Sequence, residues 1–197
     1  MKEMKVKITF TEGVLGTAPA DGDVYANYIA SKAPDATTIE DEVATLGADE
    51  VLENKLTVFH KERAKPFVYD YWIKGFFKGA CGFLRNAADK KSKGLTSYKK
   101  KIDGLVFVKE RKIFFEDFDG IAVCQRPLRA QTAQGDRVAL SASEEIPAGA
   151  TLTFTIVMLD DGMEKLVREW LDYGIYSGLG QWRNSGKGRF TWEELTD

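Results

Sequence analysis

The stretch from Gly178 to Phe190, GLGQWRNSGKGRF, gathers residue types that can hold a phosphate group. Glycines allow positive φ angles and let another backbone approach closely, because no Cβ is in the way. Consecutive amide groups exposed in this way can form an anion-binding concavity, to which Arg183, Lys187 and Arg189 add positive charge. The same composition also suits a helix cap and a tight turn with ordinary surface charges. Glycine content alone leaves both interpretations open.

A predicted helix that begins near Ile73 carries a second group of basic residues. Its buried face is predicted by apolar residues at steps of three and four, which are Ile73, Phe76, Phe77, Ala80, Leu84 and Ala87. Lys74, Lys78 and Arg85 are spaced at intervals of four and seven, so they share another face of this helix. Taken alone, such a stripe is typical of a solvated helix face.

The predicted helix continues into a basic loop, which we place at about residues 89–102 and expect to be mobile. The loop contains KKSKGLTSYKKK and includes Lys90, Lys91 and Lys93. Basic side chains on phosphates give a salt-sensitive affinity that is independent of nucleotide sequence. Trp182 and Tyr98 are candidates for stacking on a base. Together with the glycine-rich stretch, these residues favour nucleic-acid binding over a solvated helix face and a disordered loop.

The charge of the chain is divided between two segments, although the formal net charge is only −2. From Glu12 to Glu53 there are ten acidic residues and one lysine, so this segment carries −9. From Lys74 to Lys101 there are nine basic residues and one acid, so that segment carries +8. Local charge decides where a polyanion binds, because the field decays over about 8–10 Å. The middle of the chain can therefore bind phosphate, and two copies could associate through their oppositely charged segments.

The hydrophobic pattern predicts an α+β fold in a single domain, residues 1–197. Strands are predicted at 6–10, 105–108, 113–115, 121–128, 138–141 and 152–158, with a short last strand that contains Phe190 and Trp192. Helices are predicted from Ile73 onward and at Met163, Leu166, Val167 and Trp170, with a short one at about 38–46. We also expect a hairpin with limbs at 56–59 and 67–71.

Reduced to its core, the predicted order is strand, helix, two strands, helix, strand. This is the βαββαβ order of a ferredoxin-like, RRM-like sheet with its helices on one face. The prediction adds an acidic N-terminal insertion at about 18–65 and extra β-hairpins.

The composition predicts a soluble, cytoplasmic protein. No uninterrupted apolar run approaches the ~18–20 residues that a membrane span needs, and the start, MKEMKVKITF, lacks the pattern of a secretory signal. Cys81 and Cys124 have no metal-type spacing and lie in apolar surroundings, which favours reduced thiols. We expect no cofactor and no metal site.

The spacing of the glycines matches a known pattern. Gly178-Leu179-Gly180, five residues and Gly186-Lys187-Gly188 resemble the C-terminal loop, G-hydrophobic-G-x5-G-x-G, of the RAMP superfamily of CRISPR RNA-binding proteins. In that family the loop also lies between the second helix and the last strand. Lys187 departs from the family, which prefers an apolar residue there.

Two further segments are similar to backbone subunits of this superfamily. The first helix of those subunits has a spacing of glycine and basic residues similar to that of Ile73-Lys-Gly-Phe-Phe-Lys78-Gly followed by Arg85. The family's Pro and Ser-Ser are missing here. The early segment FTEGVLGT resembles their first strand and the small-residue turn after it.

The resemblance implies a noncatalytic protein that holds single-stranded, guide-type RNA through its phosphate backbone. The residues that would hold it are Lys74, Lys78, Arg85, Lys90, Lys91, Lys93, Gly178, Gly180, Trp182, Arg183, Gly186, Lys187, Gly188 and Arg189. Implied partners are other CRISPR subunits or further copies of the chain, in antiviral defence. A stand-alone or phage-borne relative is also compatible with the resemblance.

Two alternatives stay open. The first is a viral protein-interaction module that imitates a CRISPR subunit, in which the acidic insertion serves as a nucleic-acid mimic. The second is an endoribonuclease, since some RAMP proteins process CRISPR transcripts with a histidine near the first helix. His60 is the single histidine, and an imidazole can act as a general base for a 2′-hydroxyl, but nothing in the sequence fixes its position.

Overall fold

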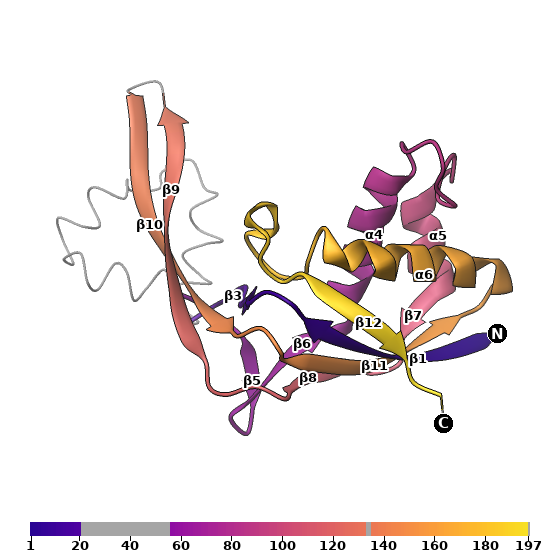
Figure 1. Ribbon diagram of the computed structural model, residues 1–197, viewed down its shortest axis with the longest axis horizontal. Coiled ribbons are helices and arrows are strands. Elements are labelled where there is room, and N and C mark those ends of the chain that lie inside the picture. The colour runs from indigo at the N-terminus through magenta and orange to yellow at the C-terminus, as the bar shows by residue number, and fades with distance from the viewer. Residues whose placement is uncertain (21–55, 133–134, 197) are drawn as a thin grey trace. The chain divides into compact units, whose positions relative to one another are not determined.

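The structure is a computed structural model that describes residues 1–20, 56–132 and 135–196 (Figure 1). The chain is mixed α+β, as predicted, and divides into two compact units. Unit 1 comprises Met1–Val14, His60–Gly120 and Ile146–Asp197, and unit 2 comprises Leu15–Phe59 and Ile121–Glu145. This division does not test the prediction of one domain over 1–197, which stays a prediction. The predicted helix at 38–46 and most of the acidic insertion lie outside the described residues.

Unit 1 is built on a seven-stranded antiparallel sheet with the order β12-β1-β11-β8-β6-β5, in which β7 also pairs with β11. The strands are β1 (Lys2–Phe10), β5 (His60–Glu62), β6 (Lys65–Tyr69), β7 (Val106–Val108), β8 (Lys112–Glu116), β11 (Thr151–Met158) and β12 (Phe190–Glu194). The first and last strands of the chain are therefore neighbours.

Three helices lie on one side of this sheet in Figure 1: α4 (Asp70–Leu84), α5 (Tyr98–Leu105) and α6 (Glu164–Asp172). Alternate residues of β1 and β11 are buried, as period-two strands covered on one face require. Helix α4 buries Ile73, Phe76, Phe77, Ala80 and Leu84, which confirms the predicted stripe. Ala87 lies beyond the end of the helix. Helix α6 buries Leu166, Val167 and Trp170, also as predicted.

Two local predictions are corrected. The hairpin before α4 is formed by β5 and β6, so its first strand is the polar segment at His60 and not residues 56–59. The turn between these strands, Arg63-Ala64, has positive φ angles at both residues. The predicted basic loop is also shorter than expected, because Tyr98–Leu105 forms helix α5.

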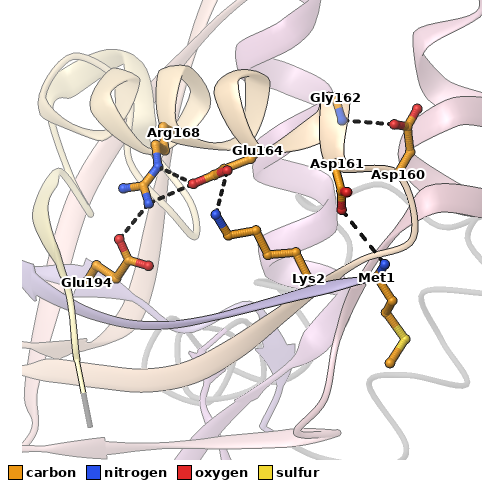
Figure 2. A network of polar contacts seen from close by, with 8 residues as sticks. All are labelled: Met1, Lys2, Asp160, Asp161, Gly162, Glu164, Arg168 and Glu194. Atoms are coloured by element: carbon orange, nitrogen blue, oxygen red, sulfur yellow. Dashed lines mark hydrogen bonds and ion pairs between the residues drawn. The ribbon is translucent and has the colours of Figure 1, made fainter.

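An ion-pair network joins β1, α6 and β12, as Figure 2 shows. Lys2 Nζ lies 2.7 Å from a carboxylate oxygen of Glu164, and Arg168 contacts Glu164 at 3.0 Å and Glu194 at 2.6 Å. The pKa of Glu164 is lowered, mainly by the hydrogen bond from Lys2 and then by that from Arg168. Nearby, the Asp160 carboxylate accepts from Gly162 N at the start of the 3₁₀ turn Asp161–Met163.

Unit 2 has its own sheet, with the order β2-β10-β4-β3 and with β9 paired to β10. Its strands are β2 (Val14–Leu15), β3 (Ala18–Pro19), β4 (Thr57–Val58), β9 (Ala122–Thr132) and β10 (Gly135–Ile146). Strands β9 and β10 form a long antiparallel hairpin, in agreement with the predicted extra hairpins. Thr57 and Ser143 hydroxyl oxygens lie 2.6 Å apart where β4 runs parallel to β10.

Within the described ranges, none of the helices has the length and apolar character needed to cross a membrane. Cys81 and Cys124 are both free thiols. Cys81 is fully buried in unit 1, and its burial raises the pKa of the thiol.

Candidate nucleic-acid interface

The glycine-rich loop, which we define as residues 178–189, closes through a contact between its two ends. A Cβ at Gly178 would lie 2.0 Å from the carbonyl carbon of Gly188, so the backbones can meet only without side chains. Leu179 N donates to Gly188 O at 2.9 Å across this contact. Gly188 N in turn donates to Gly13 O, which fastens the loop to the turn after β1. Close backbone approach, one of the two uses expected of these glycines, is therefore confirmed.

The second expected use, positive φ, is confirmed at Gly180, Gly186 and Gly188. The expected exposure of consecutive amides is met only in part. Besides the two bonds at the ends of the loop, Ser185 N donates to Trp182 O and Gly186 N donates to Arg183 O. Several amides are therefore used within the protein, and an anion here would depend largely on the basic side chains.

The basic side chains of the glycine-rich loop differ in their surroundings. Arg183 is exposed, and one of its guanidinium nitrogens would lie 3.9 Å from a Cβ at Gly79 of α4. The Arg189 guanidinium packs over Gly186, and among the described residues its Nε is buried without a hydrogen-bond partner. Lys187 is half-buried.

Trp182 occupies a left-handed backbone conformation, with φ 54°, and is 37% exposed. An exposed indole on a fixed turn can stack on a base.

Two basic residues of the predicted stripe on α4 already have an acidic partner. Lys78 Nζ lies 2.6 Å from Asp103 of α5, and Lys74 Nζ lies 3.9 Å from the same carboxylate. Lys74 also donates to the Asp103 carbonyl and lies over the Phe107 ring. The side chains of Lys74 and Lys78 are only 17% and 32% exposed, so they help to join α4 to α5.

Arg85 directly follows the last turn of α4 and stacks over Tyr98, with 5.2 Å between the guanidinium carbon and the ring centre. Tyr98 packs against Gly82, where a Cβ would lie 3.1 Å from the phenol oxygen. Tyr98 was a candidate for base stacking, and the structure shows that its ring already has a cationic partner.

The basic loop between α4 and α5 is fastened to α6 at one point. The Glu169 carboxylate accepts from Lys91 N at 2.6 Å, from Ser92 N at 2.9 Å and from Ser92 Oγ at 2.6 Å. Trp170 Nε1 donates to the same hydroxyl at 2.9 Å. Ser92 is completely buried, whereas the predicted phosphate contacts Lys90, Lys91 and Lys93 are exposed. The fixed backbone at Ser92 thus projects these lysines from a defined place.

His60, the weak catalytic candidate, lies on β5 in a cluster of aromatic rings. Its ring stacks on Phe67 at 5.8 Å and meets Tyr69 edge-on at 5.0 Å. Arg111 and Lys112 lie over rings of the same cluster. These neighbours were not predicted from the sequence, although the alternation of Phe67 and Tyr69 along a strand indicates that they share a face.

Comparison with known proteins finds similarity in structure only. No family model matches the chain, and no curated protein matches it in sequence. A chain in the cryo-EM structure of the type III-B Cmr-beta bound to cognate target RNA matches with a TM-score of 0.52 at 12% sequence identity. The match covers 99% of this chain and 60% of the other, so this chain spans three-fifths of the length of its structural neighbour. At this identity the similarity shows a shared fold.

Proposed function

We propose that this chain is a noncatalytic RAMP-like protein that binds single-stranded RNA. The proposal includes a ferredoxin-like core made of β1, α4, β7 with β8, β11, α6 and β12. The four strands of a βαββαβ chain, numbered along the sequence, lie in the order 4-1-3-2 in its sheet. With β1 as the first strand, β7 and β8 together as the second, β11 as the third and β12 as the fourth, the observed antiparallel order matches and supports this core. The fold shared with a chain of an RNA-bound Cmr-beta structure supports it independently.

The observation that carries the RNA proposal is the approach of the glycine-rich loop to α4. Arg183 reaches α4 at Gly79, and a Cβ built at Gly75, one turn earlier, would have no atom within 4 Å. Glycine is unfavourable inside a helix by ~1 kcal/mol relative to alanine. Packing within the chain does not require a glycine at Gly75, where a side chain would have room. A phosphate backbone that passes close to the helix provides a reason for this glycine, with Arg183 beside it.

The remaining basic residues extend this surface. Lys78 shares the carboxylate of Asp103 with Lys74, so this trio retains a net positive charge. Lys90, Lys91 and Lys93 supply further exposed cations. Other subunits of a CRISPR ribonucleoprotein, or further copies of the chain along one RNA, are the partners that we propose.

The proposal is tested by measuring the affinity of the full chain for short single-stranded RNAs of unrelated sequence at several salt concentrations. The double variant Arg183→Ala, Lys187→Ala should bind all of them more weakly, with a log–log salt slope reduced by about 2. Lys165→Ala removes an exposed lysine of α6 outside the proposed surface and is the matched control.

An affinity of the double variant equal to that of the wild type removes the glycine-rich loop from the site. No RNA binding by the wild type at low salt overturns the proposed function. That second outcome, combined with binding of the chain to a CRISPR complex, favours the protein-interaction alternative.

A further inference from the structure

Five aromatic side chains form a continuous cluster in the part of the sheet made by β5, β6 and β8. We call this cluster the aromatic platform, and its members are His60, Phe67, Tyr69, Tyr71 and Phe114. Phe67 contacts Tyr69 at 5.1 Å and Phe114 at 5.5 Å, and Tyr69 stacks on Tyr71 at 5.4 Å. His60 contacts Phe67 and Tyr69, so each of the five rings contacts at least one other.

The strand register places most of this platform on the sheet face opposite the helices. His60 pairs with Phe67, which pairs with Phe114, and cross-strand partners lie on the same face. The neighbouring pair Val68 and Ile113 points the other way, and both side chains are 1% exposed in the core. The platform therefore lies on a different face from the glycine-rich loop and the exposed face of α4.

The platform is not sealed from solvent. Tyr71, in the first turn of α4, exposes 49% of its surface, and His60, Tyr69 and Phe114 are half-buried, whereas Phe67 is buried beneath them with 4% exposed. The ring available for stacking is therefore chiefly that of Tyr71, with parts of the half-buried rings beside it. The pKa of Tyr71 is raised above its usual value, chiefly by desolvation.

Cations border the rings. The Arg111 guanidinium lies 4.9 Å from the Tyr69 ring and 5.8 Å from the Tyr71 ring, and its side chain is 67% exposed. Lys112 Nζ lies 5.2 Å from the Phe67 ring. Arg111 pairs with Asp70, and Lys112 pairs with Glu62.

The charge of this region is positive. Residues 60–70 and 109–112 together hold six basic residues and three acidic ones: Lys61, Arg63, Lys65, Lys109, Arg111 and Lys112 against Glu62, Asp70 and Glu110. An aromatic surface with a surplus of cations complements a ligand that combines flat rings with negative charge. Single-stranded nucleic acid has that chemistry, because bases stack on aromatic rings while phosphates meet Arg and Lys.

We infer that the aromatic platform is a second RNA contact, which stacks on bases of a single strand through Tyr71 and its neighbouring rings. This inference rests on the proposed function, which supplies RNA as the ligand, and adds a surface that responds to bases. Arg111 holds the two tyrosine rings and offers its exposed edge to a phosphate. His60 belongs to the platform as a stacking ring, with no catalytic role.

The test compares single-stranded RNA with an abasic oligomer that has the same number of phosphates. The full-length wild type should prefer the RNA, because only the RNA has bases to stack. Tyr71→Ala should weaken RNA binding by about tenfold, or about 1.4 kcal/mol, and leave binding of the abasic oligomer unchanged. Tyr71→Phe keeps the ring and should bind like the wild type.

Leu159→Ala is the control, since it removes an apolar side chain that is 50% exposed and lies outside both proposed surfaces. Because Tyr71 is half exposed, the alanine variant should keep its fold, which circular dichroism and thermal unfolding will verify. Cross-linking of RNA that carries 5-iodouridine, followed by peptide mapping, provides an independent measurement and should label residues 60–71 or 111–114.

The outcomes separate the two proposals. Wild-type protein that binds no RNA overturns the proposed function, and the inference falls with it. Wild-type protein that binds RNA, with Tyr71→Ala equally strong and no cross-link in these peptides, overturns the inference alone. Loss of self-association in Tyr71→Ala without a change in RNA affinity assigns the platform to protein contacts and also overturns it.

Discussion

The two faces of the main sheet of unit 1 present basic residues in different ways. On the helix side, Lys74 and Lys78 are shared by Asp103, and Glu169 fixes the basic loop through its backbone. On the outer face, Arg111 and Lys112 lie over aromatic rings. On the helix side Lys74 and Arg85 also lie over rings, those of Phe107 and Tyr98. The rings beneath Arg111 and Lys112 differ because they belong to the aromatic platform. We therefore expect the proposed helix-side surface to bind phosphates independently of nucleotide sequence, and the proposed platform to depend on the presence of bases.

The largest effect on stability is expected at the backbone contact that closes the glycine-rich loop, on the helix side of the sheet. Gly188→Ala places a Cβ 2.0 Å from Leu179 O at a residue with φ 71°, so the ends of the loop must separate. The free energy of unfolding should fall by about 3 kcal/mol, as urea denaturation will measure. Gly75→Ala, in open space on α4, is the control and should raise it by up to ~1 kcal/mol. Equal destabilisation by both changes would contradict the proposed tight closure.

The second effect concerns the attachment of the basic loop. The Glu169 carboxylate accepts hydrogen bonds from Lys91 N, Ser92 N and Ser92 Oγ. Glu169→Gln replaces one of its oxygens by an NH₂ group, which donates and cannot accept from them. Stability should fall by about 1–3 kcal/mol because a donor is left without a partner. Hydrogen exchange at residues 90–93 should accelerate more than in the sheet. Unchanged exchange there would show that Glu169 does not hold the loop.

A smaller change should increase affinity. Asp103→Asn removes the carboxylate that Lys74 and Lys78 share, so the positive charge near α4 rises by one. RNA affinity at low salt should rise by about threefold and converge with the wild type at high salt. Asp119→Asn changes the net charge equally at an exposed residue of another loop and serves as the control. A similar gain in both variants would mean that only net charge matters.

The smallest effect is on the pH dependence of stability. Asp117 and Glu164 should both make the folded chain more stable at neutral pH than at acid pH. The pKa of Asp117 is lowered, mainly by the hydrogen bond from Thr151 and then by Lys7, and that of Glu164 is lowered mainly by Lys2. A carboxyl group whose pKa is lower in the folded chain contributes stability above its unfolded-state pKa and loses it as pH falls through the folded value. The melting temperatures of Glu164→Gln and Asp117→Asn should lie slightly below that of the wild type at pH 7. They should approach it below about pH 4.

Much of the fold follows from periodicity. Helix α4 was predictable because Ile73, Phe76 and Phe77 recur at helical spacing, and β1 because its apolar residues alternate. The hairpin of β5 and β6 was misplaced because its first strand is polar and its turn lacks glycine. Helix α5 was missed since lysines dominate it and Ile102 is its one buried residue. Such short elements depend on tertiary contacts that local patterns do not contain.

The candidate site was predictable in its residue types but not in their partners. The glycine spacing indicated a constrained loop, and the structure explains it by the contact of Gly178 with Gly188. Nothing in the local sequence indicates that Asp103 shares two lysines or that Glu169 binds Ser92, because these pairs are far apart along the chain. The aromatic platform was missed for the same reason, since β8 brings Phe114 to Phe67.

The hydrogen bond from Gly188 to Gly13 also bears on the order of folding. The turn that accepts it follows the first strand of the sheet, and the donor precedes the last strand, β12, which pairs with β1. Contacts between such distant residues form late, because the cost of closing so long a loop must first be offset. In a partly folded chain in which β12 is not yet paired with β1, the glycine-rich loop therefore lacks its final geometry. The hairpin of β5 and β6 can form earlier, because its two strands are adjacent in the sequence. The surface that we propose for phosphates is therefore expected to form after the one that we propose for bases.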